Sequence, residues 1–412
     1  MFSASRRAAS EISLLLLFLF AIFLEDLSDS AYVDDEIRQC SEDTERFLAI
    51  DQRLRLPGAL HANIVSMRPS GSKMAEMTTP WSWYSDPAVL AREEETIFRH
   101  AWHYLGQLGD AGDVVPGWAG RVPVVVVKAE DGAERAFVNV CRHRGSVVVE
   151  EAGSRKTLQC PYHAWTYGLD GSLRAAPRSE REAVDLSDVS LSPVRLESWG
   201  PFRFVNLDAE APPLAELLGD IPERIAAAGL DVDELVFHHR ADWEVAANWK
   251  IACENFLECY HCPTAHPGFS SLVDVSPDSY ELAAGEGHWS QFGQLRSRGD
   301  AELPVGQFHF LWPNTGINIF PGRPNLSIGP IIALASDRTR RVLDYFFASD
   351  ATDAWIEEFL EFDDQVGRED ARLVELVQRG AGSGVIPEGR LLPESELLVA
   401  GFQARVREAL AR

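Results

Sequence analysis

The chain has 412 residues, of which 46% are hydrophobic, and this is enough for two cores of ordinary size, so two folded domains are predicted. Its formal net charge of -25 at pH 7 disfavours binding to nucleic acid or to an anionic membrane surface. The six cysteines lack the dense spacing of a secreted disulfide scaffold, so we predict reduced thiols and a cytoplasmic location.

The first 76 residues differ in composition from the rest of the chain. Residues 12–24 form an apolar run after two arginines, which resembles the apolar part of a secretion signal and is short for a membrane span. The acidic segment that follows has no clear cleavage site of small residues, and Met74 and Met77 stand just before a natural start for a folded chain. We therefore predict that residues 1–76 are a disordered or wrongly assigned N-terminal extension, with no membrane attachment.

Regular patterns begin at Pro87. Apolar residues at helical spacing predict a helix over residues 88–102. Runs of β-branched residues then predict strands over 122–127 and 136–140, joined by a hairpin turn at Asp131-Gly132. A strand over 200–207 closes this β-rich region, and the Ala-Pro-Pro segment that follows it marks a domain boundary.

Two short runs in the β-rich region each combine a cysteine with a histidine. Cys141 and His143 form the first run, and Cys160 and His163 form the second, both beside turn-forming residues that indicate loops. Two thiolates on one iron and two imidazoles on the other hold a Rieske-type [2Fe–2S] cluster, in which the neutral imidazoles raise the reduction potential. Zinc is the alternative, but a zinc finger places its cysteines together and its histidines on a following helix. The pattern therefore predicts an electron-transfer cluster.

A second group of metal-ligand residues occupies a run that starts with helical character. Glu258 and His261 are three residues apart, on one face of that helix. His266 is five residues beyond His261, which on an unbroken helix would turn the two imidazoles about 140° apart. Pro263 and Pro267 predict a break that lets the second imidazole approach the first. Two histidines and one carboxylate form the facial triad of non-haem ferrous oxygenases.

The third ligand of such a triad has to come from elsewhere in the chain. An acidic amphipathic pattern predicts a helix over residues 355–379. We choose Asp370 from this helix as the third ligand. Glu369 and the Asp363-Asp364 pair remain alternatives, because the acidic residues of a charged helix face usually only contact solvent and the pattern does not single one out.

Together these motifs resemble the oxygenase (alpha) subunit of Rieske non-haem iron oxygenases, the aromatic-ring-hydroxylating family and its alkylammonium-oxidising relatives. The resemblance extends from Trp81 to the C-terminus and rests on Cys-Arg-His-Arg-Gly at 141–145, Cys-Pro-Tyr-His-Ala-Trp at 160–165, Asn-Trp-Lys at 248–250, Glu-Asn-Phe-Leu-Glu-Cys-Tyr-His at 254–261 and His-Pro at 266–267. It implies an α+β fold, with an antiparallel-β Rieske domain over residues 101–210. A helix-grip catalytic domain with a central antiparallel sheet is expected over 211–412, and a helix within 77–100 is expected to pack on it.

The resemblance also implies roles for individual residues. The [2Fe–2S] cluster would be bound by Cys141, His143, Cys160 and His163, and a mononuclear Fe(II) by His261, His266 and Asp370. The Glu369-Asp370 pair, with Gln378 eight residues beyond the aspartate, matches the late ligand segment of the family. Glu258 stands where the family has an acidic residue that bridges the two metal sites for electron transfer, and a role limited to orienting His261 is the alternative.

The implied partners follow from the same family. NAD(P)H would act indirectly, through a separate reductase or ferredoxin, and dioxygen and a small organic molecule would be the substrates. Neighbouring subunits of a homotrimer would bring the cluster of one chain to the iron of the next. A non-catalytic Rieske electron carrier is the alternative of another class, but such a carrier needs no second metal site.

The substrate remains open between an aromatic compound and a quaternary ammonium compound of the betaine, choline or carnitine type. The strand-like run 308–320 is expected to supply the pocket walls, through Phe308, Phe310, Leu311, Trp312, Ile317, Ile319 and Phe320. Aromatic rings there can attract a cation. Cys259 and Cys262, on either side of His261, are predicted to be further wall residues and not a redox pair, and Asn255 is left without a role.

Overall fold

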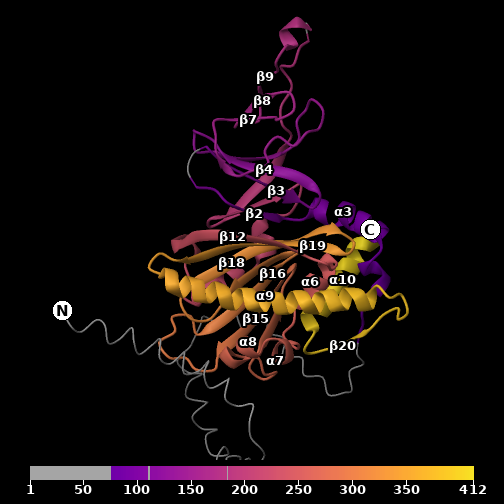
Figure 1. The fold of residues 1–412 in the computed structure, drawn as a ribbon, viewed down its shortest axis with the longest axis vertical. Helices are drawn as coiled ribbons and strands as arrows, with labels where there is room; N and C mark the ends of the chain where they lie inside the picture. The colour runs from indigo at the N-terminus through magenta and orange to yellow at the C-terminus, as the bar shows by residue number, and fades with distance from the viewer. Residues whose placement is uncertain (1–75, 110–111, 183) are drawn as a thin grey trace, which may run out of the picture. The chain divides into compact units, whose positions relative to one another are not determined.

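The computed structural model describes residues 76–109, 112–182 and 184–412. Antiparallel sheets and the helices that cover them make up this part of the chain (Figure 1). The predicted extension over residues 1–76 lies outside the described residues, apart from Glu76. That residue pairs with Leu391 in the short ladder of β1 (Glu76–Met77) and β20 (Arg390–Leu391).

A seven-stranded antiparallel sheet contains the first half of the described chain. Its order is β2 (His103–Gln107), β11 (Phe202–Asn206), β10 (Pro193–Trp199), β5 (Glu134–Val138), β4 (Val122–Lys128), β3 (Asp113–Ala119) and β6 (Gly153–Ser154). Alternate valines of β4 pack into different cores, because successive side chains of a strand point to opposite faces. Val125 and Val127 pack in the cluster that contains Cys141 and Cys160, whereas Val124 and Val126 pack with Leu105.

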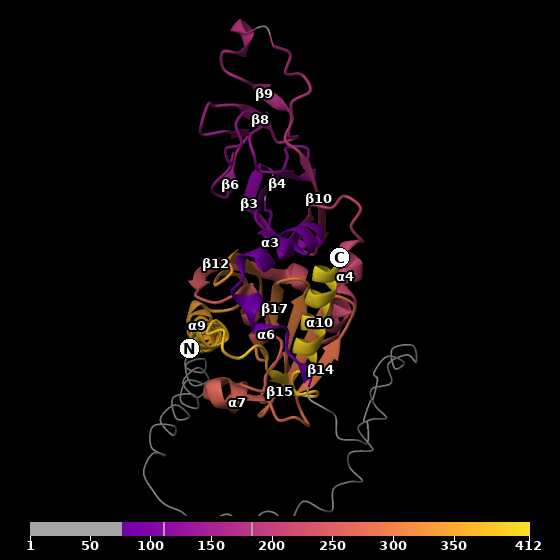
Figure 2. The ribbon, with the colours of Figure 1, turned by 90° about the vertical axis from the view of Figure 1, so that its right-hand side faces the viewer.

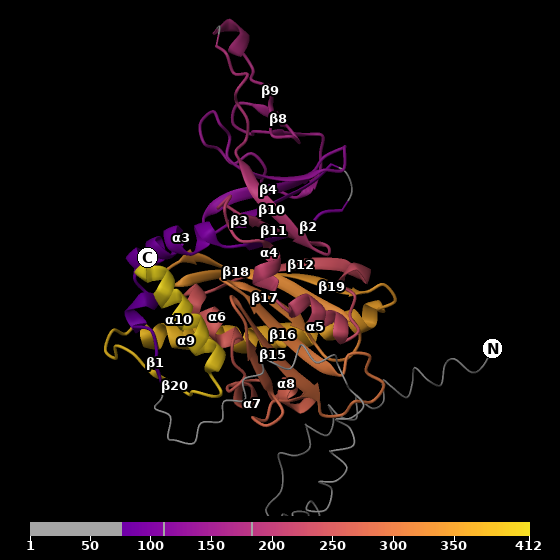
Figure 3. The ribbon, with the colours of Figure 1, turned by 180° about the vertical axis from the view of Figure 1, so that it is seen from behind.

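A smaller sheet carries the second cysteine–histidine run. It consists of β7 (Thr157–Gln159), β8 (Thr166–Gly168) and β9 (Leu173–Ala175), all antiparallel. The loop between β7 and β8 holds residues 160–165. Figures 2 and 3 show β8 and β9 beyond β3 and β4, on the side away from β12.

An eight-stranded antiparallel sheet forms the centre of the second half. Its main path is β12 (Leu235–Val245), β19 (Arg338–Ala348), β18 (Asn325–Ala335), β17 (Thr315–Ile319), β16 (Val305–Leu311), β15 (His288–Leu295) and β13 (Val273–Asp274), and β14 (Glu281–Ala284) also pairs with β15. The long helix α9 (Asp353–Ala381) runs across this sheet (Figure 1). Leu343, Tyr345 and Phe347 of β19 pack against Ile356 of this helix. The predicted α+β fold, with a helix gripped by an antiparallel sheet, is confirmed.

The two larger sheets meet through a buried polar contact. Asp344 of β19 accepts hydrogen bonds from Tyr104 Oη at 2.6 Å and from Arg240 Nε at 2.6 Å. Arg240 also donates to the backbone oxygen of Leu105 in β2 at 2.9 Å. Because every partner in this contact is satisfied, it joins the sheets without leaving a buried charge unpaired.

The helix predicted over residues 88–102 is shorter than expected. Helix α3 (Pro87–Thr96) begins with Asp86, whose side chain accepts a hydrogen bond from Ala88 N, and is followed by a short 3-10 turn at Phe98–His100. The chain is extended from His103 onward, because Trp102 and Tyr104 pack in the core beside β11. Periodicity alone did not indicate this change of direction.

Several shorter helices surround the central sheet. They are α4 (Leu214–Leu218), α5 (Ile221–Ala227), α6 (Trp249–Phe256), α7 (Cys262–Ala265), α8 (Pro267–Leu272) and α10 (Leu397–Ala411). Leu90, Ile97 and Phe98 of the N-terminal segment pack in one core with Trp249 of α6 and Phe402 of α10.

Helix α6 starts at the Asn-Trp-Lys motif, and each residue of that motif has a structural partner. The Asn248 side chain caps the helix by accepting from Lys250 N at 3.0 Å. Trp249 Nε1 donates to Glu93 at 2.8 Å, and Lys250 Nζ donates to the other carboxylate oxygen of Glu93 at 2.6 Å. These contacts bind α6 to α3, and α6 leads directly into the second group of metal-ligand residues.

Candidate metal centres

The two cysteine–histidine loops have the same backbone geometry. In the first loop, Cys141 N donates to Ser146 O at 2.8 Å and Gly145 N donates to Cys141 O at 3.1 Å. In the second loop, Cys160 N donates to Trp165 O at 2.8 Å and Ala164 N donates to Cys160 O at 3.1 Å. The residue four places after each cysteine has a positive φ, 74° at Gly145 and 58° at Ala164. Two matching loops therefore each present one thiol and one imidazole.

The four side chains divide into a buried half and an exposed half. Cys141 and Cys160 are buried in one hydrophobic cluster, whereas His143 and His163 are exposed. The two imidazole rings lie with their centroids 4.7 Å apart. His143 also stacks on Trp165, at a centroid distance of 4.8 Å and an interplanar angle of 5°. The thiols thus face the core and the imidazoles form the tip.

Polar groups around Cys160 favour the ionised form of its thiol. Burial opposes ionisation of Cys160, yet hydrogen bonds from the backbone of Tyr162 and His163 and from Cys141 bring its pKa below the ordinary thiol value. Tyr167 Oη lies 3.3 Å from Cys141 Sγ and accepts a hydrogen bond from Arg142 N at 3.0 Å. Burial, followed by this contact with Cys141, raises the pKa of Tyr167. A neutral tyrosine hydroxyl can donate to a thiolate sulfur at this position.

This donor set fits a [2Fe–2S] cluster of the Rieske type. Two buried sulfurs can ligate one iron and two adjacent exposed imidazoles the other. The buried thiols and the facing imidazoles come from two separate loops, whereas a zinc finger takes its histidines from a helix.

The second site forms where the chain breaks after α6, as the two prolines predicted. Helix α7 has Pro263 in its first turn and ends at Ala265, and α8 begins at Pro267. His261 and His266 are the residues that flank α7. This short helix brings the two imidazoles together, with 3.2 Å between their Nε2 atoms.

Asp370 of α9 completes the group. Its Oδ1 atom lies 2.9 Å from His266 Nε2 and 3.4 Å from His261 Nε2. Among the described residues, these three are the cluster whose ligand atoms all lie close enough to hold one ion, within 4.8 Å of one another. The other candidate carboxylates have other contacts, since Glu369 contacts His266 Nδ1 and Asp363 accepts from Tyr345 Oη.

Each ligand-type side chain has an outer partner that orients it. Glu258 contacts Nδ1 of His261, and Glu369 Oε2 lies 2.7 Å from Nδ1 of His266. Asn255 Nδ2 donates to Asp370 Oδ1 at 3.1 Å. These contacts leave the two Nε2 atoms free to face the same point, as metal-ligating histidines require. Asn255 was left without a role from sequence, and its place three residues before Glu258 was the available indication. Helix α6 ends at Phe256, so the prediction that Glu258 and His261 share one helix face was wrong, and a contact across the turn after α6 joins them instead.

The carboxylates make the site strongly favourable for positive charge. Burial opposes protonation of His261, but its contacts with Asp370 and Glu258 raise its pKa to about 9. The pKa of His266 is raised in the same way, by Asp370 and Glu369 against the effect of burial. Burial disfavours the Asp370 carboxylate, yet contacts with both histidines hold its pKa below the ordinary value. Two imidazoles and one carboxylate with this excess of negative charge fit a divalent iron with open coordination positions.

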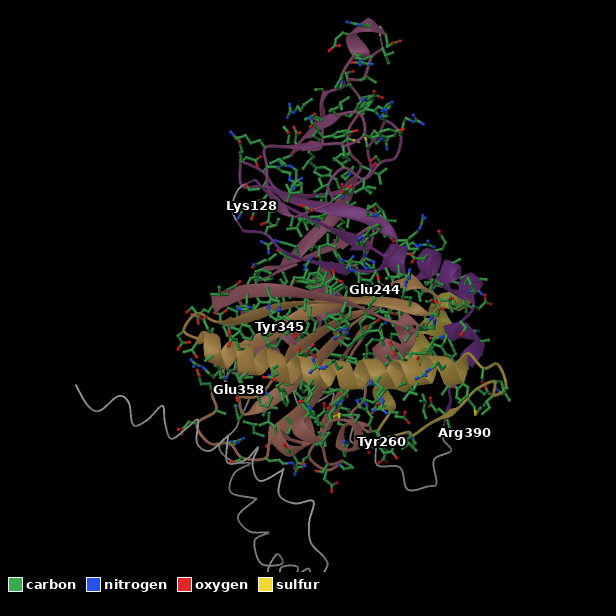
Figure 4. The ribbon with its side chains drawn as sticks, in the orientation of Figure 1. Lys128, Glu244, Tyr260, Tyr345, Glu358 and Arg390 are labelled. Atoms are coloured by element: carbon green, nitrogen blue, oxygen red, sulfur yellow. A yellow bond between two sulfur atoms is a disulfide. The ribbon has the colours of Figure 1, made fainter. Side chains whose placement is uncertain are left out.

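A cavity of about 620 Å³ opens beside these three residues. Its aromatic lining consists of Trp243, Phe256, Phe269, Tyr280, Phe308, Phe320 and Tyr345. Of the predicted wall residues only Phe308 and Phe320 line it, and Phe310, Leu311, Trp312, Ile317 and Ile319 pack in hydrophobic cores instead. The prediction was wrong for these five because the run forms two strands, β16 and β17, whose alternate faces could not be assigned from the sequence. Figure 4 labels Tyr345 of the cavity on β19, and Tyr260 in the segment that leads into α7.

Cys259 and Cys262 both line the cavity, as predicted, and they form a disulfide. The prediction of reduced thiols is therefore wrong for this pair. The reason is the turn into α7, which brings the two Cα atoms to 4.9 Å, within the range that a disulfide spans. Cys141, Cys160 and Cys253 are free thiols among the described residues.

Comparison with known proteins assigns both halves of the chain. A model described as the Rieske [2Fe-2S] domain matches residues 101–195, and one described as the ring hydroxylating alpha subunit (catalytic domain) matches residues 232–412. The carnitine monooxygenase oxygenase subunit of Acinetobacter pittii (strain PHEA-2) is 32% identical over 333 residues, which cover 77% of this chain and 89% of that protein. The chain belongs to the Rieske non-haem iron oxygenase alpha subunits.

Other members of this oxygenase family are similarly related. The chloroplastic choline monooxygenase of Beta vulgaris is 29% identical over 369 residues, covering 86% of this chain and 82% of that protein. A crystal structure of the quaternary ammonium Rieske monooxygenase CntA with an inhibitor superposes with a TM-score of 0.75 at 31% identity, covering 81% of this chain and 96% of the other.

Membership of the Rieske oxygenases establishes the type of chemistry. The protein is an oxidoreductase that uses a [2Fe–2S] cluster, a mononuclear iron and dioxygen, with electrons from NAD(P)H delivered by a reductase. The non-catalytic electron carrier is therefore excluded, because the catalytic domain is present. In the described part of the chain, no helix has both the length and the apolar character of a membrane span.

Proposed function

We propose that this oxygenase oxidises a quaternary ammonium compound. The observation that carries the proposal is the cavity beside the His–His–Asp cluster, which combines aromatic walls with carboxylates. Tyr280, Trp243 and Tyr345 lie around it together with Glu258 and Asp363. Aromatic faces attract a trimethylammonium group through cation–π interactions, and nearby carboxylates favour the positive charge. The names of the similar proteins, carnitine and choline monooxygenases, support the same substrate class.

We assign the metal ligands from the geometry. Cys141, His143, Cys160 and His163 bind the cluster, and the ligands of the mononuclear iron are His261, His266 and Asp370. When bound, the cluster supplies single electrons and the iron supplies the site at which dioxygen is activated. Glu258 and Glu369 hold the two imidazoles by their Nδ1 atoms, so that both Nε2 atoms remain directed at the metal position.

We further propose that electrons reach the iron from a neighbouring subunit, through Glu258, in a homotrimer. The separation of the two sites within one chain supports this arrangement. The β7–β8 loop lies beyond the seven-stranded sheet, whereas α7, which His261 directly precedes, lies near β15, at the end away from β8 and β9 (Figures 1 and 2). We propose that the enzyme is located in the cytoplasm, because its electrons come from a nicotinamide-dependent reductase.

A substrate panel tests the proposed function. Dioxygen uptake and the release of amine or aldehyde are measured with the reductase system, for trimethylammonium compounds and for aromatic acids of similar size. Uptake coupled to product is expected only with the trimethylammonium compounds. Coupled turnover of aromatic acids alone would contradict the proposal and favour ring hydroxylation.

The variant His261→Ala tests the site assignment. The intact subunit holds three iron atoms, two in the cluster and one in the mononuclear site, and the variant is expected to keep only the two of the cluster. Turnover should be lost, and the red-brown Rieske spectrum should be retained. His100→Ala, at an exposed histidine that pairs with Asp208, is the matched control and should keep all three properties. Turnover that persists in His261→Ala would contradict the assignment.

Mixing experiments test the route between subunits. A cluster-free variant, Cys141→Ser, and His261→Ala are each expected to be inactive alone. Co-expressed chains should form mixed trimers with partial activity, because an intact cluster then faces an intact iron site. No recovery in mixed trimers would contradict transfer between subunits.

A further inference from the structure

Arg341 differs from the other arginines of its strand. Arg338 and Arg340, also in β19, form ion pairs with Glu244 and Asp242 of β12. The side chain of Arg341 forms neither a hydrogen bond nor an ion pair with any residue that the structure describes, and it contacts the ring of Phe256.

The side chain of Arg341 faces the cavity beside the metal ligands. Successive residues of a strand point to opposite faces, so Arg341 shares a face with Leu343 and Tyr345, which pack toward α9. Arg341 lines the cavity, and its guanidinium carbon lies 5.6 Å from the centroid of the Phe256 ring. A Cβ atom at Gly316 would lie 3.5 Å from Arg341 Nη2 and 3.1 Å from the Phe256 ring. The glycine therefore leaves room for both side chains.

Nearby carboxylates do not satisfy the guanidinium. Burial lowers the pKa of Arg341, and the negative charges of Asp363 and Asp370 only partly offset this effect. Asp363 already accepts from Tyr345 Oη, and Asp370 Oδ1 contacts His266 and Asn255. A guanidinium has five N–H donors, and leaving them unpaired in a site removed from water is costly. These donors are available to a group that enters the cavity.

We propose that Arg341 binds a carboxylate of the substrate, so that the substrate is a zwitterion with a carboxylate and a quaternary ammonium group. This inference rests on the proposed function and specifies its substrate class. Arginine is suited to the role, because its planar fork binds both oxygens of a carboxylate. A purely cationic substrate would meet an unpaired positive charge in the same cavity, whereas a zwitterion neutralises it. The aromatic rings of the cavity remain for the ammonium end.

Two compounds of nearly equal size allow the contribution of the carboxylate to kcat/KM to be measured separately from that of the ammonium group. One is 4-trimethylammonio-butanoate, and the other is its primary amide, which has the same ammonium group and no negative charge. For the wild-type holoenzyme with its reductase system, kcat and KM are measured by dioxygen uptake and amine release. We expect kcat/KM to be about 100-fold higher for the acid, which is the scale of one charge-assisted ion pair, and the difference should appear chiefly in KM.

Variants assign the preference to this residue. Arg341→Met should remove the preference, by lowering kcat/KM for the acid about 100-fold while the amide changes several-fold at most. Arg341→Lys keeps the charge without the fork and should restore part of the preference. Arg340→Met is the matched control, one residue away on the opposite face of β19, and should retain the full preference.

The outcomes distinguish this inference from the proposed function. Equal kcat/KM for acid and amide in the wild type would overturn the carboxylate site while leaving oxidation of quaternary ammonium compounds intact. Equal losses for both compounds in Arg341→Met would also overturn it, because a structural role acts on both. Turnover of neither compound, with coupled turnover of an aromatic acid, would overturn the proposed function and this inference with it. The wild-type comparison holds even if a variant fails to fold.

Discussion

Replacing Lys250 with methionine is expected to destabilise the catalytic domain by leaving a buried carboxylate without its counter-charge. Lys250 and Glu93 are almost fully buried, with side-chain exposures of 1% and 0%, and their Nζ and Oε1 atoms lie 2.6 Å apart. In Lys250→Met, Glu93 keeps only the hydrogen bond from Trp249 Nε1. Lys250 Nζ also lies 5.4 Å from the ring centroid of Tyr84 and 5.5 Å from that of Trp249. Methionine has a similar volume and an unbranched, adaptable side chain, so it fills much of the same space without the charge.

The expected cost follows from the burial. Removing one partner of a buried ion pair costs about 3–5 kcal/mol, because the remaining charge is left in an apolar environment. The exposed pair of Arg338 and Glu244 provides the comparison, with side-chain exposures of 58% and 56% and a distance of 3.6 Å. Arg338→Met should cost at most about 1 kcal/mol. In the double variant Glu93→Leu/Lys250→Met no charge remains, so most of the loss should be recovered.

Urea denaturation of the holoenzyme, followed by tryptophan fluorescence, measures this difference. With a denaturant slope of about 2–3 kcal/mol per molar, Lys250→Met should lower the midpoint by about 1–2.5 M. The absorbance of the Rieske cluster reports separately on the seven-stranded domain, and its midpoint should not move. A shift for Lys250→Met no larger than for Arg338→Met would refute the reasoning. A double variant at least as unstable as the single one would refute it too.

Three further predictions concern other groups of the catalytic domain. Burial raises the pKa of Glu254 to about 7 from 4.5, against the effect of hydrogen bonds from Tyr84 and Gln403. The free energy of unfolding therefore falls by up to about 3 kcal/mol as pH rises through that interval. In Glu254→Gln the free energy of unfolding, measured by urea titration, should change less between pH 5 and pH 8 than in the wild type. Parallel curves for the two proteins would contradict this. Asn255→Ala removes the hydrogen bond to the Asp370 carboxylate and should weaken mononuclear iron binding about 10- to 100-fold in chelator competition, with an unchanged Rieske spectrum. In the cluster-free, unfolded chain, thiol titration without reductant should find at most four of the six cysteines, because Cys259 and Cys262 are paired. Finding all six would contradict the disulfide.

Local sequence predicted most of the two proposed ligand sets. The cysteine–histidine runs predicted a cluster between two loops because each run combines its ligands with turn formers over a few residues. The break between His261 and His266 was predicted for the same reason, since proline removes a helical hydrogen bond wherever it lies. The helix that carries Asp370 was predicted from its periodicity, and the structure extends it only slightly at each end.

Contacts between distant segments decided the rest. Asp370, Glu369 and Asp363 are close in sequence on one helix, and only the packing of α9 against α7 and β19 gives each a different partner. Which residues of β16 and β17 face the cavity likewise depends on the register of each strand, and the neighbouring strands set that register. For this reason five residues that were expected to line the cavity pack in the hydrophobic core instead.

The sequence by itself therefore determined the kind of chemistry, because ligand type and short spacing are properties of the chain. The tertiary structure alone decided which side chains line the cavity. It faces Arg341 into the cavity while Arg340 pairs on the other side of the sheet, and it brings Cys259 within reach of Cys262. The face of a sheet to which a side chain points, and the closure of a turn, arise from the packing of the whole domain. Neighbouring residues in the sequence do not encode them.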